Sequence, residues 1–290
     1  MSNLATHRLA FAQELREIAR LKSDSLVSAF ATVPREWYLG AGPWNVLVVG
    51  DDGKLGYRLT ENADPVQTYR NIVIAIDPAR GLHNGQPECL AAWMDRLELG
   101  AGESVIQIGC GTGYYTAILA EVVGPTGRVT AYEVDASLAE RAKSNLNQFA
   151  QVEVISAAGA RLLPDSADAI FVNCGVTEPP LSWLSCLRKN GRMVLPITAS
   201  PDDTGVGAGA MFLFTREAPG FSIEYLSPAA FFPCIGARSQ HANEQLLTKA
   251  DDDWLAPKSI RMEPHAEESS CWLHSENCCL STIALCARGA

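Results

Sequence analysis

The sequence lacks the features that would place it in a membrane or on a nucleic acid. No apolar run reaches the roughly 18 residues that a membrane span needs, and the first twenty residues are polar, without the apolar centre of a signal peptide. Lysine and arginine do not cluster, and the formal net charge is −10. We therefore expect a cytoplasmic protein with no membrane and no nucleic acid among its partners.

Internal repeats, low-complexity tracts and a disulfide framework are also missing. The nine cysteines are odd in number and show no repeating spacing, which favours reduced, buried thiols. Hydrophobic residues make up 47% of the 290 residues, enough for a sizeable core. The composition is that of an ordinary globular protein, and it leaves the oligomeric state open.

One short apolar strand ends in three alternating glycines. Residues 105–108 are Val-Ile-Gln-Ile, and Gly109, Gly111 and Gly113 follow before a helical pattern starts at Tyr114. Glycine has no Cβ, so it permits positive φ and lets the backbone approach a ligand closely. The spacing is G-x-G-x-G, whereas the dinucleotide fingerprint G-x-G-x-x-G places its third glycine one residue later. The loop predicts a cofactor site and argues against a nicotinamide dinucleotide.

An acidic residue stands near the end of the next predicted strand. This strand covers residues 128–134, and Glu133 lies twenty residues beyond Gly113. A carboxylate at the tip of the second strand can accept hydrogen bonds from both ribose hydroxyls of a nucleoside. An adenosine carrier without a pyrophosphate fits both features, which favours S-adenosyl-L-methionine.

Strands and helices alternate through the middle of the chain. This order predicts an α/β fold with a Rossmann-like, mostly parallel, doubly wound sheet, an antiparallel C-terminal strand, and ligands beyond the carboxyl ends of the strands. A helix 180–188, stopped by Asn190-Gly191, is expected before the strand 192–196. The other expected strands are 105–108, 128–134, 152–155, 168–174, 210–216, 221–226, 270–273 and 279–285, with a hairpin at 46–59; the other expected helices are 5–21, 25–31, 88–97, one between Gly113 and Gly124, and 136–149.

Six motifs follow one another in order between about residues 25 and 240. They are Val33-Pro34-Arg35, Gln86-Pro87, Val105 to Tyr114, Ala169 to Gly175, Leu187 to Pro196 and Phe221 to Gly236. Together they resemble the protein-L-isoaspartate O-methyltransferase family. The resemblance implies a class I methyltransferase fold and S-adenosyl-L-methionine as methyl donor, with S-adenosyl-L-homocysteine as product.

The order of the expected elements and the extent of the resemblance divide the chain, and the resemblance also assigns cofactor contacts. Residues 1–80 would form an N-terminal helical and hairpin cap, 81–240 the S-adenosylmethionine-binding methyltransferase domain, and 241–290 a C-terminal extension packing on the catalytic domain. Two of the three acids expected around the cofactor are replaced, by Gln107 and Ala158, while Glu133 remains. The implied cofactor-binding residues are Gln107, Gly109, Gly111, Gly113, Tyr114, Glu133, Ala158 and Asn173.

The family's substrate loop T-I-S-Q-P falls on residues 83–87. The loop residues are His83, Asn84, Gly85 and Gln86, so Gly85 replaces the serine linked to isoaspartyl methylation. His83 is the candidate catalytic residue, either as a base or as a group that binds an acceptor carboxylate. A surface histidine without a catalytic role is the alternative.

The residues favour a carboxylate as methyl acceptor. Methyl transfer from a sulfonium is an in-line displacement that needs alignment and exclusion of water. A carboxylate is ionised near neutral pH and needs no general base, and the sequence offers no convincing base with an orienting partner. We therefore expect an enzyme of the EC 2.1.1 class that methylates a carboxylate of a peptide or protein.

Two alternatives stay open at this point. The altered substrate loop and the added extension would also suit a small-molecule methyltransferase of biosynthesis. The replaced serine and acids would suit a catalytically inactive, cofactor-binding adaptor.

The extension carries cysteines and histidines whose role the sequence does not decide. Cys271, His274, Cys278 and Cys279 stand close together, with His265 upstream. Zinc accepts such ligands, but their spacing matches no paired-ligand pattern, and alternation along strands explains it. We expect no metal here, and we hypothesise that the extension covers or shapes the acceptor site.

Overall fold

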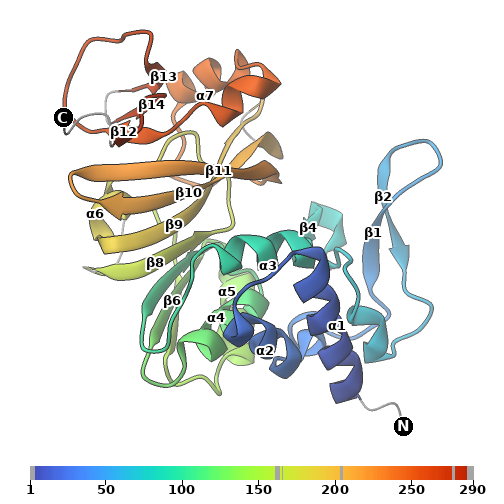
Figure 1. The fold of residues 1–290 in the computed structure, drawn as a ribbon. Helices are drawn as coiled ribbons and strands as arrows, with labels where there is room; N and C mark the ends of the chain where they lie inside the picture. The colour runs from blue at the N-terminus through green and yellow to red at the C-terminus, as the bar shows by residue number, and fades with distance from the viewer. Residues whose placement is uncertain (1–3, 161–163, 165, 203–204, 276–277, 286–290) are drawn as a thin grey trace. The chain divides into compact units, whose positions relative to one another are not determined.

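The computed structural model describes residues 4–160, 164, 166–202, 205–275 and 278–285. The chain divides into two units, each built from two stretches of sequence (Figure 1). The first unit joins Met1–Gly102 to Cys110–Ser156, and the second joins Glu103–Gly109 to Ala157–Ala290. Within the described ranges, every helix is too short or too polar to span a membrane.

Two helices begin the first unit. α1 (Leu4–Ile18) buries Phe11, Ala12 and Leu15, which share one face at helical spacing. α2 (Asp24–Thr32) begins after Ser23, whose hydroxyl accepts a hydrogen bond from the Leu26 N–H at 3.2 Å. Both helices confirm the predictions for residues 5–21 and 25–31.

A hairpin and several short elements follow. β1 (Asn45–Val49) pairs antiparallel with β2 (Leu55–Leu59), as predicted, and the light-blue hairpin projects from the helices of its unit (Figure 1). The remaining elements before the glycine loop are η1 (Arg35–Tyr38), η2 (Pro65–Thr68), β3 (Ala75–Asp77), η3 (Pro78–Arg80), β4 (Leu82–His83) and α3 (Pro87–Asp95).

The second stretch of the first unit contains a parallel strand pair. α4 (Tyr114–Val123) is buried along almost its whole length and ends at Gly124. β6 (Arg128–Glu133) runs parallel to β7 (Val152–Ser156), and α5 (Ala136–Asn145) connects them. α5 is shorter than the predicted 136–149.

An aromatic core joins the N-terminal helices to α4. The Tyr114 ring lies 6.3 Å from Phe30 and 5.6 Å from Tyr38, and Phe11 lies 6.5 Å from Phe30 and 6.0 Å from Tyr69, between ring centroids. Such edge-on pairs add to the stabilisation that burial of the rings provides. The start of the helix after the glycine loop is thereby fixed by residues of the N-terminal segment.

Parallel strands form one end of the sheet in the second unit. β5 (Ser104–Ile108) pairs parallel with β8 (Ala167–Val172), which pairs parallel with β9 (Leu187–Ala199). An antiparallel series continues through β10 (Gly207–Glu217), β11 (Gly220–Phe231), β12 (Ser259–Arg261), β14 (Cys279–Ser281) and β13 (Cys271–His274). The predicted α/β class is confirmed, and the antiparallel part extends well beyond a single strand.

One predicted helix end is wrong. α6 covers only Leu181–Cys186, and β9 begins at once with Leu187, so Asn190-Gly191 lies inside a strand. Asn190 has φ 63°, and the partners of β8 jump from Leu187 to Arg192. Asparagine tolerates the left-handed region, so the dipeptide forms a bulge in the strand and does not stop a helix.

The segment after residue 239 packs on the sheet of the second unit. α7 (Gln240–Leu247) begins at Ser239, whose hydroxyl accepts from the Ala242 N–H at 3.3 Å, and η4 (Asp251–Leu255) follows. Trp272 of β13 lies 6.3 Å from Phe212 of β10 between ring centroids. The division of the chain at residues 80 and 240 stays a prediction.

Candidate cofactor and acceptor site

The glycine loop of the first unit is shaped by backbone hydrogen bonds. The Cys110 N–H donates to the Tyr132 carbonyl at 3.1 Å, and the Gly113 N–H donates to the Cys110 carbonyl at 3.0 Å. Gly113 has φ 93°, and a Cβ there would lie 2.8 Å from Leu146 Cδ1. Only glycine fits this position, and the loop turns directly into α4.

Glu133 fixes the loop from the end of β6. Its Oε2 accepts from the Gly111 N–H at 2.7 Å, and its Oε1 accepts from the Asp135 N–H at 3.0 Å. Glu133 is buried, with 7% of the residue exposed. Burial raises the pKa of Glu133, and the hydrogen bonds from the Asp135 and Gly111 backbone oppose that rise. Each carboxylate oxygen has a second lone pair with which it can accept a ribose hydroxyl.

The segment before the substrate loop lies against the glycine loop. A Cβ on Gly111 would meet Ile76 Cδ1 at 3.7 Å. The Arg80 guanidinium hydrogen-bonds the Asp77 carboxylate at 2.7 Å and pairs with the Asp135 carboxylate two residues after Glu133. These hydrogen bonds from Arg80 lower the pKa of both aspartates. The contacts bring the segment that precedes the predicted substrate loop beside the glycine loop within one unit.

A fully buried arginine holds the substrate loop. The Arg35 guanidinium donates to the backbone carbonyls of Thr68 and Arg70, at 2.8 and 2.9 Å, and of Ile72, at 2.8 Å. It also donates to Asn84 Oδ1 at 3.3 Å. Burial lowers the pKa of Arg35. The sequence motif Val33-Pro34-Arg35 contained this residue, but its role as a clamp depends on four partners that are 33 to 49 residues away.

A second polar group holds the end of the loop. Gln86 Nε2 donates to the side-chain oxygen of Asn71 at 2.8 Å and to its carbonyl at 3.0 Å. Asn71 Nδ2 donates to the Glu88 carboxylate at 2.9 Å. Asn84 and Gln86 therefore position the loop, and the role of Asn71 had no sequence signal beyond its polar side chain.

Gly85 has a conformation that excludes the family serine. Its φ is 78°, and a Cβ there would lie 2.8 Å from Leu90 Cδ2. A side chain at this position would need a left-handed backbone and a shift of Leu90. The substitution of serine by glycine is thus built into the packing of the loop.

His83 is exposed at the end of β4, and its tautomer is defined. Its Nδ1 accepts a hydrogen bond from the Gly85 N–H at 3.2 Å. A neutral imidazole that accepts at Nδ1 carries its proton on Nε2, where it is a donor. Desolvation by neighbouring atoms lowers the pKa of His83. The ring is suited to donate a hydrogen bond to an anionic acceptor.

The second unit carries four of the predicted cofactor residues, Gln107, Gly109, Ala158 and Asn173. Gln107 is fully buried in β5. Asn173 follows β8, donates from Nδ2 to the Gly109 carbonyl at 3.4 Å, and its backbone lies 3.3 Å from a Cβ placed on Gly109. Asn173 Oδ1 is buried and has no hydrogen-bond partner among the described residues. A buried acceptor of this kind is costly unless a ligand donates to it, which fits a cofactor amino group.

Two predicted cofactor residues offer no polar side chain to a ligand. Ala158 follows β7 and is half-buried. Tyr114 is 2% exposed and its ring is packed in the aromatic core. Only the backbone of Tyr114, at the first turn of α4, is left for a cofactor contact, so both assignments stay predictions.

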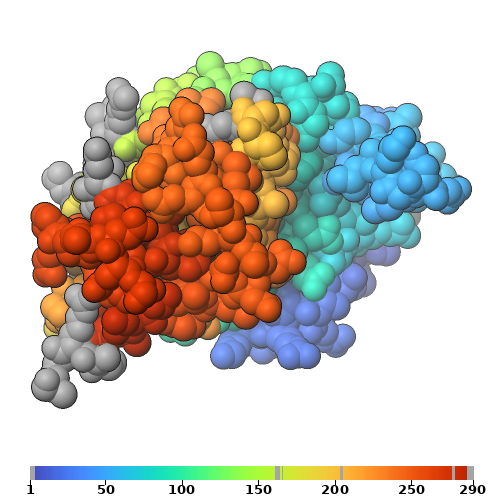
Figure 2. All heavy atoms as spheres, turned by 90° about the horizontal axis from the view of Figure 1, so that it is seen from above, coloured from blue at the N-terminus to red at the C-terminus, as the bar shows by residue number. Residues whose placement is uncertain are grey.

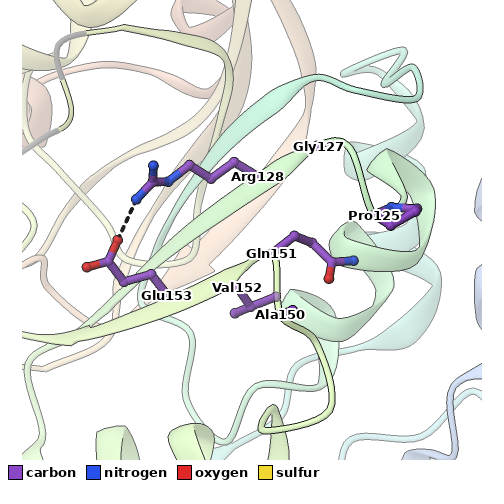
Figure 3. A pocket seen from close by; sticks show the side chains of 7 residues that line it. All are labelled: Pro125, Gly127, Arg128, Ala150, Gln151, Val152 and Glu153. Atoms are coloured by element: carbon purple, nitrogen blue, oxygen red, sulfur yellow. Dashed lines mark hydrogen bonds and ion pairs between the residues drawn. The ribbon is translucent and has the colours of Figure 1, made fainter.

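A shallow hollow lies at the opposite end of the β6–β7 pair. It is lined by Pro125, Gly127, Arg128 and residues 150–153. Figure 3 shows the ion pair between Arg128 and Glu153, with an N–O distance of 2.9 Å. Arg128 begins β6 and Glu133 ends it. The hollow is therefore at the amino end of the strands, away from the carboxyl end where ligands bind in such sheets.

The fold and these groups define a class I, S-adenosyl-L-methionine-dependent methyltransferase. Comparison with known proteins gives the family. The sequence model described as "Protein-L-isoaspartate(D-aspartate) O-methyltransferase (PCMT)" matches residues 58–239, more than half of the chain. The chain belongs to this family and is an O-methyltransferase related to its members.

Two relatives show the extent of the similarity. The protein-L-isoaspartate O-methyltransferase of Ignicoccus hospitalis is 33% identical over 153 residues, which cover 51% of this chain and 70% of that protein. The one of Aeropyrum pernix is 30% identical over 203 residues, which cover 67% of this chain and 68% of that protein.

Solved structures share the fold. A protein-L-isoaspartate O-methyltransferase matches with a TM-score of 0.59 at 24% identity, covering 79% of this chain and 66% of that chain. A Plasmodium falciparum protein described by the same activity, in complex with S-adenosyl-L-homocysteine, matches with a TM-score of 0.59 at 17% identity. The match covers 78% of this chain and 97% of that chain. Because both sequence identities are below 25%, these two matches show only that the fold is shared.

Proposed function

We propose that this enzyme transfers a methyl group from S-adenosyl-L-methionine to a carboxylate of a peptide or protein. The observation that carries the proposal is the state of His83. Because Nδ1 already accepts the Gly85 N–H, the neutral ring has a donor at Nε2 and no lone pair there to remove a proton. Such a ring binds a carboxylate, which reacts without a general base.

The cofactor contacts are part of this proposal. In the first unit, Glu133 would bind the ribose hydroxyls, and the backbone at Gly111, Gly113 and Tyr114 would lie along the cofactor. In the second unit, taken by itself, Asn173 Oδ1 would accept from an amino group, and Gln107, Gly109 and Ala158 are the other predicted contacts. When bound, the cofactor supplies an electrophilic methyl group on a sulfonium.

The residues of the chain then have to align the acceptor and exclude water. Arg35 and Asn71 hold residues 83–88 through side-chain hydrogen bonds, so the position of His83 is defined before an acceptor binds. Preorganisation of this kind lowers the entropy that alignment costs. It supports in-line transfer to an oxygen held by the His83 Nε2–H.

A transfer assay with two peptides of one sequence tests the proposal. One peptide contains an L-isoaspartyl residue and the other contains an ordinary aspartyl residue, and the methyl group of the cofactor is radiolabelled. We expect label on the isoaspartyl peptide that is released as methanol by mild alkali, since methyl esters hydrolyse and N-methyl or ether products do not. Alkali-stable label would contradict a carboxylate acceptor, and label only on small carboxylic acids would favour the small-molecule alternative.

A variant pair separates acceptor binding from cofactor binding. We expect His83→Ala to lower transfer while the dissociation constant of S-adenosyl-L-homocysteine stays unchanged. His7→Ala, which removes an exposed histidine from α1, serves as the matched control. Transfer that is equal in both variants would remove His83 from the acceptor site. Cytoplasmic location and the absence of a nucleic-acid partner stay predictions.

A further inference from the structure

Four possible metal ligands meet in the extension, outside the residues that match the family. They are His265, Cys271, His274 and Cys279, and their ligand atoms all lie within 4.8 Å of one another. His265 comes from the segment between β12 and β13, Cys271 and His274 from β13, and Cys279 from β14. His265 and Cys279 are 14 positions apart in sequence, and the β13–β14 hairpin with the segment before it brings them together.

A β-bulge brings the ligands of β13 to one face. Residues three apart in a regular strand, such as Cys271 and His274, point to opposite faces. Here Cys271 pairs with Ser281 and His274 pairs with Cys279, because the register shifts between Cys271 and Leu273. Since 279 and 281 share a face of β14, the bulge places Cys271 and His274 beside Cys279.

The two histidines are oriented for ligation. His265 Nδ1 lies 2.8 Å from the Glu263 carbonyl, to which it donates, and this leaves Nε2 facing Cys271 Sγ at 3.4 Å. A backbone carbonyl on the distal nitrogen is the usual support of a metal-bound histidine. His265 and His274 stack edge to face, with ring centroids 4.9 Å apart.

His274 supplies an independent observation. Its Nδ1 is buried and has no hydrogen-bond partner within the part of the chain that the structure describes. Its backbone, by contrast, is fully engaged, because Gln245 Oε1 accepts its N–H at 3.2 Å and Gln245 Nε2 donates to its carbonyl at 2.9 Å. A buried ring nitrogen without a partner costs stability unless an ion or a donor occupies the site.

We propose that these four side chains bind a structural Zn²⁺ ion. Two thiolates and two imidazoles are the donor set that zinc takes in tetrahedral geometry. Zinc at its usual bond lengths would hold the four ligand atoms about 3.3–3.8 Å apart. The distance of 3.4 Å between His265 Nε2 and Cys271 Sγ already falls in this range. Side-chain rotations would bring the other ligand atoms to such distances.

The ion would stabilise the far edge of the sheet in the second unit. β12, β13 and β14 are only three or four residues long, and residues 262–270 between β12 and β13 form no helix or strand. A bond from His265 to the β13–β14 hairpin ties this segment down. Four protein ligands leave no open position, so the site is structural and not catalytic.

The ion has access to the site. His265, Cys271 and His274 are half-buried, and only Cys279 is fully buried. Figure 2 shows the orange and red atoms of the residues after 240 on the surface of the molecule. Zn²⁺ with two thiolates is neutral, so its burial carries no uncompensated charge.

Metal content and metal titration of the full chain test the proposal. The chain is purified under reducing conditions, stripped with a chelator, and titrated with Zn²⁺ alone and with Co²⁺ as a spectroscopic probe. We expect one Zn²⁺ per chain, visible Co²⁺ bands of a tetrahedral site with thiolate charge transfer, and a lower melting temperature after chelation. Cys271→Ser and His265→Ala should each weaken Zn²⁺ binding by at least about tenfold.

Matched controls exclude nonspecific binding and misfolding. Cys89→Ser and His7→Ala remove the same residue types outside the cluster and should keep full Zn²⁺ binding. Circular dichroism and S-adenosyl-L-homocysteine binding report whether each variant folds, independently of the metal. The proposal would be overturned if the reduced chain took up no Zn²⁺, or if Cys271→Ser and His265→Ala left the uptake unchanged. It would also be overturned if mass spectrometry found a Cys271–Cys279 disulfide in the chain purified under reducing conditions.

Discussion

The glycine loop and the substrate loop of the first unit are held by different groups. In residues 110–113 the backbone N–H groups of Cys110, Gly111 and Gly113 donate within the protein, and one carboxylate, Glu133, both shapes the loop and can bind a ligand. In residues 83–88 the polar side chains are engaged by the protein itself, Asn84 by Arg35 and Gln86 by Asn71. The glycine loop is thus defined by backbone hydrogen bonds, whereas the substrate loop is defined by side-chain hydrogen bonds and packing, and His83 lies exposed at its start.

The largest expected effect concerns the clamp of the acceptor loop. Arg35→Met should lower the free energy of unfolding by roughly 3–5 kcal/mol, because three backbone carbonyls and Asn84 lose the donor that a fully buried guanidinium provides. Urea denaturation measures the change. Arg128→Met is the control, since its ion pair with Glu153 is exposed and should be worth less than about 1 kcal/mol. Equal losses in both variants would mean that packing does not define the acceptor loop.

A change beside the glycine loop should alter the affinity for S-adenosyl-L-homocysteine. Glu133→Ala is expected to weaken S-adenosyl-L-homocysteine binding by roughly 1.5–3 kcal/mol, the range for hydrogen bonds to a charged group. Isothermal titration calorimetry gives the dissociation constant. Glu153→Ala, which removes an exposed glutamate from the neighbouring strand, should leave it unchanged. An unaltered constant in Glu133→Ala would take this residue out of the cofactor site.

Restoring the family serine should harm the acceptor loop. Gly85→Ser is expected to cost about 1–2 kcal/mol of stability, because the position has a positive φ and a Cβ would crowd Leu90. Thermal denaturation compares it with Gly85→Ala, which adds the Cβ without the hydroxyl and should lose the same amount. A Gly85→Ser protein as stable as the parent and more active would show that packing does not exclude the serine.

The smallest effect is a pH dependence at His83. Its pKa is lowered from the ordinary 6.5, so the unfolded chain takes up a proton at a higher pH than the folded chain does. The stability that the neutral ring contributes is present above pH 6.5. It is lost as the pH falls from 6.5 through the lowered pKa of the folded state. NMR titration should give a midpoint below 6.5, and His83→Gln should flatten the decline in stability. A midpoint above 6.5 would reverse the sign and contradict the desolvation of the ring.

The sequence located the glycine loop and the strand that carries Glu133 because their signals are local. Gly109, Gly111 and Gly113 lie within five residues, and Glu133 ends the next strand, so strand periodicity and spacing sufficed. The helix stop expected at Asn190-Gly191 was wrong for a related reason. The dipeptide is a turn signal in any local reading, and only pairing with β8 makes it a bulge inside β9.

The sequence by itself determined the α/β class, the order of the motifs and the position of the glycine loop. Tertiary structure alone decided that Arg35 reaches Asn84, that Leu90 fills the space beside Gly85, and that a bulge gathers Cys271, His274 and Cys279 on one face. The physical reason is distance along the chain. Periodicity and turn chemistry act over a few residues, whereas burial, clamps and ligand clusters depend on partners that only the packed fold brings together.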